Sequence, residues 1–128
     1  MPATRRLRIL VVDDDPAMVG AITALVGTEG HQVITAYDGL TAVKRFKEDA
    51  PDVVLLDLGL PDRPGLEVAR AVRGNPDTRD TPIFALTGRV GADERRACLE
   101  AGCSAYVAKP VEPRALLRRI DETLGQGA

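Results

Sequence analysis

Residues 7–16, LRILVVDDDP, decide how the rest of the chain is interpreted. The first six residues are almost continuously apolar, which is typical of a strand covered on both faces, as in a parallel sheet. Three carboxylates follow at once, and Asp15-Pro16 has the pattern of a helix N-cap with proline at the first helical position. The stretch therefore predicts a buried strand, an acidic turn and the start of a helix.

Four more short apolar runs are predicted to form strands, at about residues 32–35, 52–56, 82–86 and 105–108. Helical patterns separate and follow these runs, at about residues 16–29, 39–49, 65–73, 92–101 and 113–124. Strict alternation of strands and helices favours an α/β fold, a doubly wound five-stranded parallel sheet with five helices on its two faces. In such sheets the ligand site lies outside the carboxyl ends of the strands.

Length and composition limit the classes of function. The 128 residues, of which 45% are apolar, suffice for a single domain with its core at about residues 7–124. A net charge of −2 provides no positive field for nucleic acid, and no apolar run approaches the roughly 20 residues that cross a bilayer. The N-terminal residues lack the apolar core of a secretory signal. We therefore expect a cytoplasmic protein that binds neither nucleic acid nor membrane.

Three of the less common side chains have simple structural interpretations. Cys98 and Cys103 lack the paired spacing of a zinc site, so they are predicted to be buried thiols. His31 stands where a strand is about to begin, and it is predicted to be a surface residue. It is not expected to be a phosphotransfer histidine.

Polar side chains follow four of the predicted strands. Asp13 and Asp14 end the first strand, Asp57 the third, Thr87 the fourth and Lys109 the fifth. These strand ends share one rim of a parallel sheet, where clustered carboxylates repel one another unless a cation neutralises them. Oxygen ligands select a hard ion, and Mg²⁺ fits best because it binds through one or two carboxylates and bridges to phosphate. Lys109 and Thr87 add the groups that would hold a phosphoryl group beside a carboxylate nucleophile.

Five motifs in this order resemble the response-regulator receiver family over about residues 7–124: VVDDDP at 11–16, LLDLGLP with GLE at 55–61 and 65–67, LTG at 86–88, AGC at 101–103 and YVAKP at 106–110. The resemblance implies a flavodoxin-like strand order 2-1-3-4-5. It also implies a function: to accept a phosphoryl group from a histidine kinase or a histidine phosphotransfer protein and to signal to a protein partner by changing shape. Such a protein is not a conventional enzyme, although it catalyses its own phosphorylation and dephosphorylation.

The resemblance assigns the phosphorylated aspartate and the metal ligands. Asp57 matches the phosphoryl acceptor. Asp13 and Asp14 match the acidic pair, of which Asp14 would contact Mg²⁺ directly and Asp13 mostly through water. The backbone carbonyl of Gly59 would supply a further metal ligand.

The resemblance also assigns the residues that respond to the phosphoryl group. Thr87 would donate a hydrogen bond to one phosphoryl oxygen, and Lys109 would pair with another, its bond to Pro110 being cis as in the family. Tyr106 matches the aromatic switch that turns inward when Thr87 moves.

Three positions depart from the usual family pattern. Gly59 replaces a larger side chain that overhangs the site, Pro64 stands where Asp or Asn is frequent, and Gly88 is smaller than the common alanine. None of these changes removes a catalytic group. They bear instead on the lifetime of the phosphorylated state and on the stiffness of the loop from residue 58 to residue 65.

Three rival functions remain beside this interpretation. A magnesium-dependent phosphatase with an aspartate nucleophile would need a second aspartate where Gly59 stands. A flavin or nucleotide binder would need a loop rich in glycine, serine or threonine after the first strand, where this chain has carboxylates that repel phosphate. A receiver that acts without phosphorylation would not need the full set of Asp57, Thr87 and Lys109. The chain could equally be a free shuttle, a regulator of a motor or enzyme, or a receiver excised from a longer protein.

The first predicted helix carries no charged residue from Pro16 to Thr28. Its inward stripe is predicted to be Met18, Ile22 and Leu25, and its outward face to be Ala17, Ala21, Ala24 and Thr28. An outward face of small residues lets another helix approach closely, and the family commonly presents this helix to the bundle that bears the donor histidine. The alternative is a helix rich in alanine for its propensity alone.

Overall fold

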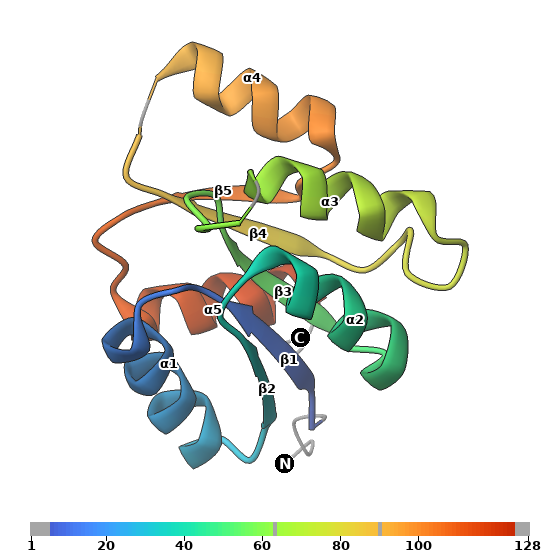
Figure 1. Ribbon diagram of the computed structural model, residues 1–128. Helices are drawn as coiled ribbons and strands as arrows, with labels where there is room; N and C mark the ends of the chain where they lie inside the picture. The colour runs from blue at the N-terminus through green and yellow to red at the C-terminus, as the bar shows by residue number, and fades with distance from the viewer. Residues whose placement is uncertain (1–5, 63, 90, 125–128) are drawn as a thin grey trace.

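Five parallel strands form one sheet in the computed structural model, which describes residues 6–62, 64–89 and 91–124 (Figure 1). The strands are β1 (Arg8–Val12), β2 (Gln32–Ala36), β3 (Val53–Asp57), β4 (Ile83–Thr87) and β5 (Ala105–Ala108). The helices are α1 (Pro16–Thr28), α2 (Gly39–Asp49), α3 (Gly65–Gly74), α4 (Ala92–Ala101) and α5 (Pro113–Leu124). Each expected element is present, with bounds that differ from the prediction by a residue or two.

The strand order is β2-β1-β3-β4-β5, so the predicted doubly wound fold and its order are confirmed. β1 pairs with both β2 and β3, which places the switch point of the sheet beside the carboxyl end of β1. Val12 lies opposite Leu56 and Asp57 lies opposite Leu86. This register sets Asp13, Asp57 and the end of β4 next to one another on one rim.

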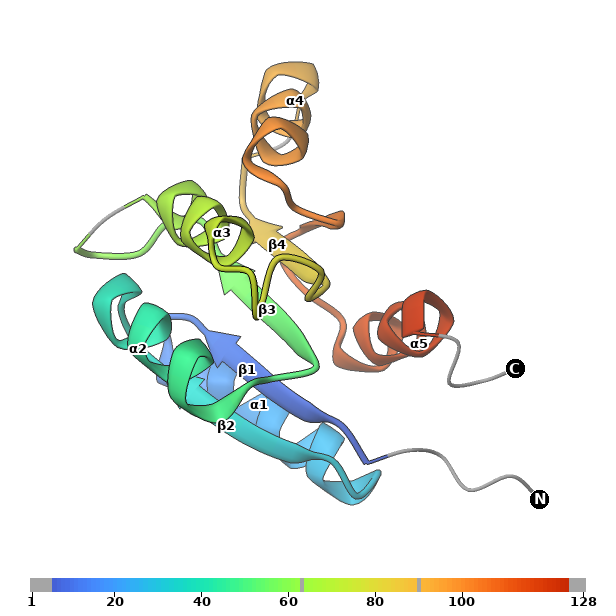
Figure 2. The same cartoon turned by 90° about the vertical axis from the view of Figure 1, so that its right-hand side faces the viewer.

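Two apolar clusters hold the helices against the two faces of the sheet. One includes Phe46 of α2, Val72 of α3 and Cys98 of α4. The other includes Ile22 of α1 and Ile120 of α5. Figure 2 shows α3 and α5 on opposite sides of the strands. Because both faces are covered, the central strands can be apolar along their whole length, as their sequences predicted.

Local signals set the helix ends as expected. The Asp15 carboxylate accepts a hydrogen bond from the backbone N–H of Ala17, and Pro16 opens α1. α4 ends at Gly102, whose φ of 99° lies in the left-handed region. A Cβ at Gly102 would lie 2.5 Å from Cγ of Arg73, so both backbone conformation and space demand glycine there.

The inward stripe predicted for α1 was wrong by part of a turn. Val19, Ile22 and Val26 are the buried residues, whereas Met18 and Leu25 are half-buried at the edges of the stripe. An apolar helix without charges gives no polar face from which its rotation could be read. The outward face is as predicted, because Ala17, Ala21, Ala24 and Thr28 are all exposed.

The prediction that His31 lies on the surface was also wrong. His31 is 6% exposed, and its Nδ1 accepts a hydrogen bond of 3.0 Å from the backbone N–H of Leu7. Leu7 precedes the first paired residue of β1, so its N–H has no partner from the β1–β2 ladder. The imidazole satisfies this buried donor at the amino-terminal edge of the sheet.

The two cysteines are buried, as predicted. Burial raises the pKa of the Cys103 thiol to about 12 and also raises the pKa of the Cys98 thiol. Neither thiol is therefore ionised near neutral pH, which suits a packing role.

The remaining sequence expectations concern membranes and targeting. Across the described ranges, no helix has the length and apolar character needed to span a bilayer. Residues 1–5, which carry most of the N-terminal stretch considered for a secretory signal, lie outside the described residues.

Candidate functional site

Three carboxylates meet at the carboxyl ends of β1 and β3. Oxygen atoms of Asp13, Asp14 and Asp57 all lie within 4.8 Å of one another. Asp13 and Asp57 are buried, whereas Asp14 is exposed. Within the described part of the chain, Oδ2 of Asp13 is a buried oxygen that receives no hydrogen bond. A buried carboxylate oxygen of this kind is costly without a cation.

Lys109, directly after β5, reaches this cluster with its ammonium group. Its Nζ lies 3.0 Å from Oδ1 of Asp57 and 3.4 Å from Oδ2 of Asp13, and its peptide bond to Pro110 is cis, as expected. Burial alone would lower the pKa of Lys109, but the hydrogen bond to Asp57 and the charges of both aspartates outweigh it. The net effect is a raised pKa. One ammonium group thus faces three carboxylates.

The two oxygens of Asp57 have different surroundings. Oδ1 accepts hydrogen bonds from Nζ of Lys109 at 3.0 Å and from the backbone N–H of Gly59 at 3.1 Å. Among the described residues, none donates a hydrogen bond to Oδ2. The carboxylate borders an open cleft of about 840 Å³ that Asp14, Thr87 and Lys109 also line. The arrangement fixes one oxygen and leaves the other for a ligand.

Burial raises the pKa of Asp13, and the negative charge of Asp57 adds to the effect. The hydrogen bond from the backbone N–H of Asp15 and the Lys109 charge act in the opposite direction. A carboxyl group with a raised pKa in the folded state stabilises the fold at low pH. That contribution is lost as pH rises through the raised value. Ionised Asp13 therefore costs folding stability at neutral pH.

Asp13→Asn is accordingly expected to raise the thermal midpoint of the Mg²⁺-free protein by several degrees, which corresponds to about 1 kcal/mol. The asparagine oxygen can still accept from the Asp15 N–H, while one buried charge is removed. Excess Mg²⁺ is expected to stabilise wild type more than the variant. Circular dichroism melts at pH 7, in a chelator and then in Mg²⁺, measure both effects. An Asp13→Asn variant that is less stable than wild type in the chelator would show that the charge of Asp13 does not destabilise the fold.

Thr87 and Tyr106 meet at one backbone carbonyl. The Thr87 hydroxyl accepts from the N–H of Arg89 at 3.0 Å and donates to the carbonyl of Arg89 at 3.3 Å. The Tyr106 hydroxyl donates to the same carbonyl at 2.7 Å. The segment after β4 thus links the Thr87 side chain at the site to an aromatic side chain on β5.

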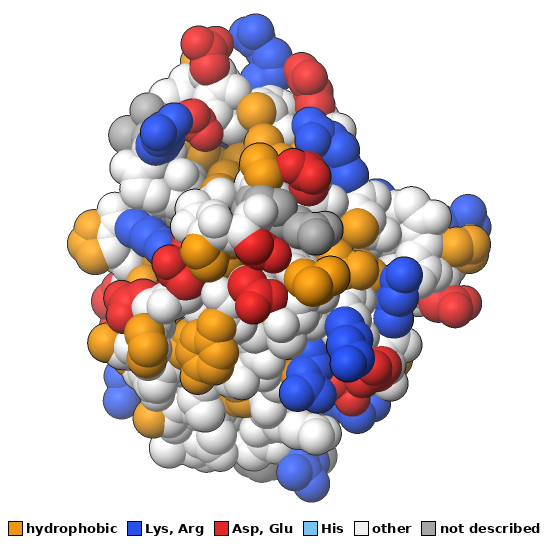
Figure 3. Space-filling view, in the orientation of Figure 1, with side chains coloured by type: hydrophobic (Ala, Val, Ile, Leu, Met, Phe, Trp, Pro, Cys, Tyr) orange, Lys and Arg blue, Asp and Glu red, His pale blue; other side chains and the backbone are white. Residues whose placement is uncertain are grey.

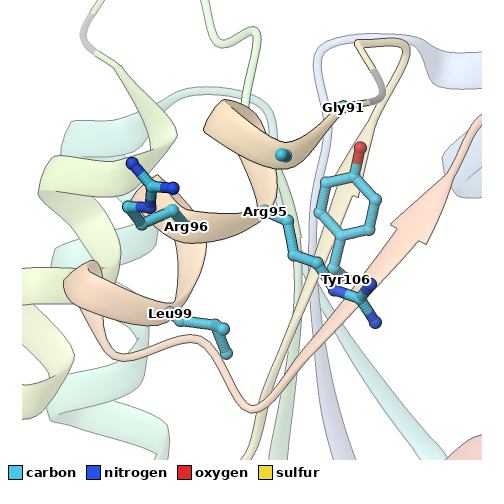
Figure 4. Close-up of a pocket in the computed structure, with 6 residues that line it drawn as sticks. Gly91, Arg95, Arg96, Leu99 and Tyr106 are labelled. Atoms are coloured by element: carbon cyan, nitrogen blue, oxygen red, sulfur yellow. The ribbon is translucent and has the colours of Figure 1, made fainter.

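Tyr106 stands at the edge of a surface pocket rather than in the core. It is half-buried and lines a pocket of about 520 Å³ with residues of the segment leading into α4 and of α4 itself: Gly91, Ala92, Arg95, Arg96 and Leu99. Figure 4 shows the ring between β5 and α4, with the hydroxyl pointing toward Gly91. A rotation of this ring would change the surface that these elements share.

A family model described as the response regulator receiver domain matches residues 9–121. This chain belongs to the response-regulator receiver family. It is a receiver domain of two-component signalling, and receiver domains are signalling proteins rather than conventional enzymes.

Individual relatives agree with this assignment. Response regulator MprA of Mycobacterium tuberculosis is 41% identical over 114 residues, which cover 89% of this chain and 49% of MprA. The chain thus spans about half the length of that relative. The chemotaxis protein CheY4 of Vibrio cholerae has a TM-score of 0.87 at 26% identity, covering 92% of this chain and 98% of CheY4.

One solved relative contains a metal ion. The receiver domain of the sensor histidine kinase PA1611 from Pseudomonas aeruginosa was solved with a magnesium ion coordinated in its active site cleft. Its TM-score is 0.85 at 32% identity, and the match covers 94% of this receiver and 99% of that chain.

Two residues near the functional elements were not found from the sequence. Asp62, in the loop after β3, accepts hydrogen bonds from the backbone of α2. Arg73, at the end of α3, donates to backbone oxygens of Thr81 and Gly102. Their partners lie 8 to 29 residues away, so local sequence patterns carry no signal for them.

Proposed function

We propose that this receiver accepts a phosphoryl group on Asp57, in a reaction that requires Mg²⁺, and signals to a protein partner by changing shape. The donor would be a histidine kinase or a histidine phosphotransfer protein in the cytoplasm. The observation that carries the proposal is the environment of the Asp57 side chain. It is a buried carboxylate with one oxygen held by Lys109 and Gly59, and it borders an open cleft.

The residues present fit a magnesium ion. The candidate ligands are all oxygens, and Oδ2 of Asp13 is buried and forms no hydrogen bond within the described residues, although Nζ of Lys109 lies 3.4 Å away. Asp13, Asp14 and Asp57 would hold the ion with their side chains, and Gly59 would do so with its backbone carbonyl. When bound, Mg²⁺ would neutralise the clustered carboxylates and draw charge from the phosphoryl oxygens.

The chain's own groups have separate roles in the transfer. A carboxylate oxygen of Asp57 attacks phosphorus of the donor phosphohistidine, so an O–P bond forms while the P–N bond breaks and the leaving imidazole takes up a proton. Lys109 balances charge beside the acceptor, and the Thr87 hydroxyl donates to a phosphoryl oxygen. Water later attacks the same phosphorus, which releases phosphate and restores Asp57.

Mixing the protein with acetyl phosphate and Mg²⁺ and weighing it intact tests this proposal. We expect a gain of one phosphoryl mass, which a chelator prevents. Asp14→Ala should need far more Mg²⁺ for the same labelling, because it removes the exposed carboxylate of the acidic pair. Labelling that is equal with and without Mg²⁺ would contradict the proposed metal requirement.

The signal is expected to pass from Thr87 to Tyr106. Phosphorylation adds charge and strong acceptor oxygens, which can compete with the Arg89 carbonyl for the Thr87 hydroxyl. A change in the Arg89 segment then biases Tyr106 between two positions, since a modest free-energy difference shifts such an equilibrium. The face made by α4, β5 and α5 would change with it.

The near-ultraviolet circular dichroism of tyrosine reports this switch, because the chain has two tyrosines and no tryptophan. Beryllofluoride with Mg²⁺, a phosphoryl mimic, is expected to change the wild-type signal. Thr87→Ala and Tyr106→Leu should each remove that change while Asp57 still accepts the phosphoryl group. A change of wild-type size in Tyr106→Leu would mean that the signal takes another route.

The outward face of α1 is expected to receive the donor protein. Ala17, Ala21 and Ala24 are exposed and small, so a helix of the partner can pack closely against them. Ala21→Glu should slow phosphotransfer from the cognate histidine protein by roughly tenfold or more, since it buries an unpaired charge in the contact. Labelling by acetyl phosphate serves as the control and should be unchanged. Phosphotransfer from the histidine protein that is as fast in Ala21→Glu as in wild type would exclude α1 as the docking face.

A further inference from the structure

Asp62 connects the loop that carries Gly59 to a different part of the molecule. This loop joins β3 to α3, and the Asp62 carboxylate accepts two hydrogen bonds from the first residues of α2. The backbone N–H of Gly39 donates to Oδ1 at 2.7 Å, and that of Leu40 donates to Oδ2 at 3.0 Å. N–H groups in the first turn of a helix have no partner within the helix, so these two are available.

We propose that Asp62 is a positioning residue that ties this loop to α2 and thereby fixes the Gly59 backbone beside Asp57. The proposal deepens the proposed function and rests on it, because the Gly59 carbonyl matters as a candidate magnesium ligand. Asp62 itself belongs to neither the acidic cluster nor the phosphoryl-binding set.

Among the described residues of the loop, backbone hydrogen bonds lie at its two ends. The N–H of Leu58 donates to Leu86 O at 3.0 Å, and the N–H of Gly65 donates to Leu58 O at 3.1 Å. The N–H of Gly59 donates to the Asp57 carboxylate. Between these ends, Leu60 packs into the core while Asp62 reaches across to α2. Asp62 therefore restrains the middle of the loop.

Two features of this sequence increase the need for such a restraint. Gly59 has no side chain, and an added Cβ would meet only Oδ1 of Asp57, at 3.8 Å, so space does not require glycine there. Glycine has a wider range of allowed φ and ψ than other residues, which leaves this backbone position less restrained. Pro64, at the N-cap of α3, forms no side-chain capping hydrogen bond. The loop thus lacks two of the local restraints that larger or capping side chains would provide.

The carboxylate suits the role electrostatically. Hydrogen bonds from backbone N–H groups to an ionised acceptor are stronger than neutral ones, and the amino end of α2 carries a partial positive charge. Asp38 caps the same helix, accepting from the N–H of Thr41 at 2.7 Å. The amino end of α2 therefore has two carboxylate caps: Asp38, which directly precedes the helix, and Asp62, which comes from the loop after β3. This pair provides a matched comparison.

Asp62→Ala and Asp38→Ala should separate loop positioning from helix capping. Both remove a cap of α2 and should lower stability by similar amounts. Asp62→Ala alone should speed amide hydrogen exchange at Gly59 and Gly65 in Mg²⁺-free protein by roughly tenfold, as loss of a charge-assisted hydrogen bond implies. It should also weaken Mg²⁺ binding, followed by amide chemical shifts during titration with MgCl₂, by about fivefold or more. Asp62→Asn retains one acceptor oxygen and should be intermediate.

Two results would overturn the proposal. One is equal loop exchange in Asp62→Ala and Asp38→Ala, which would make Asp62 an ordinary helix cap. The other is faster exchange of the loop in Asp62→Ala while the Mg²⁺ affinity stays that of wild type. Asp62 would then hold the loop without positioning the Mg²⁺ site. Wild-type protein that shows no response to MgCl₂ would instead refute the proposed function. The exchange rates at Gly59 and Gly65 would then still decide whether Asp62 holds the loop.

Discussion

Asp57→Asn is expected to reduce labelling by acetyl phosphate by at least about 100-fold, because an amide cannot replace a carboxylate as the nucleophile. The variant should fold, since the asparagine oxygen can still accept from Lys109 and Gly59, which now bond Oδ1 of Asp57. Its loss of one negative charge from the acidic cluster should also relieve repulsion with Asp13. Intact-mass spectrometry over a time course in Mg²⁺ measures the effect.

The matched control for this variant is Asp77→Asn. Asp77 is an exposed carboxylate in the segment between α3 and β4, at the amino-terminal edge of the sheet, so its substitution removes a charge far from the site. It should be labelled like wild type. If Asp57→Asn were labelled as fully as Asp77→Asn, the acceptor would be a different residue and the assignment of Asp57 would fail.

Gly65→Ala should be the most disruptive single-methyl change near the site. A Cβ at Gly65 would lie 2.6 Å from the carbonyl oxygen of Asp57, 2.6 Å from Cα of Leu58 and 3.1 Å from its Cδ2. Two of these three atoms belong to the backbone at the end of β3, which cannot move without displacing Asp57. We expect a loss of about 2–4 kcal/mol of folding stability, with slower labelling of whatever protein remains folded.

Gly20→Ala tests whether this effect is specific to position 65. Gly20 is an exposed residue inside α1, and nothing lies within 4 Å of an added Cβ. Alanine should stabilise the helix there by about 0.5–1 kcal/mol. Urea unfolding followed by circular dichroism compares the two. Equal stability of Gly65→Ala and wild type would show that the end of β3 is not packed as tightly as the distances indicate.

The fold could be predicted from the sequence because its signals are local. Apolar runs, the Asp15-Pro16 cap and the Gly102 stop each depend on residues close in the chain. The rim of candidate site residues followed from a simple rule: carboxyl ends of parallel strands share one edge. Asp13, Asp57 and Lys109 are brought together by that rule.

The features that escaped prediction depend on residues far apart in the chain. His31 is buried because its Nδ1 accepts from the N–H of Leu7, 24 residues away. Asp62 follows a proline in the loop after β3 and resembles an ordinary turn residue, yet its partners lie 22 and 23 residues earlier. Arg73 resembles a last-turn cation but holds the α4–β5 turn through Gly102 O. No periodicity or motif encodes such pairs.

Figure 3 shows acidic side chains close together near the middle of one face, beside hydrophobic ones. Tyr37 and Leu40, at the start of the α2 segment, are 48% and 64% exposed.

Chemical trapping of the phosphorylated residue tests the central claim most directly. Borohydride reduces an aspartyl phosphate to homoserine, so peptide sequencing by mass spectrometry identifies the position that carried the phosphoryl group. After incubation with acetyl phosphate and Mg²⁺, we predict homoserine at position 57 alone, and none when a chelator is present. Homoserine at position 13 or 14, or a phosphoryl mass gain without homoserine at any position, would contradict the account.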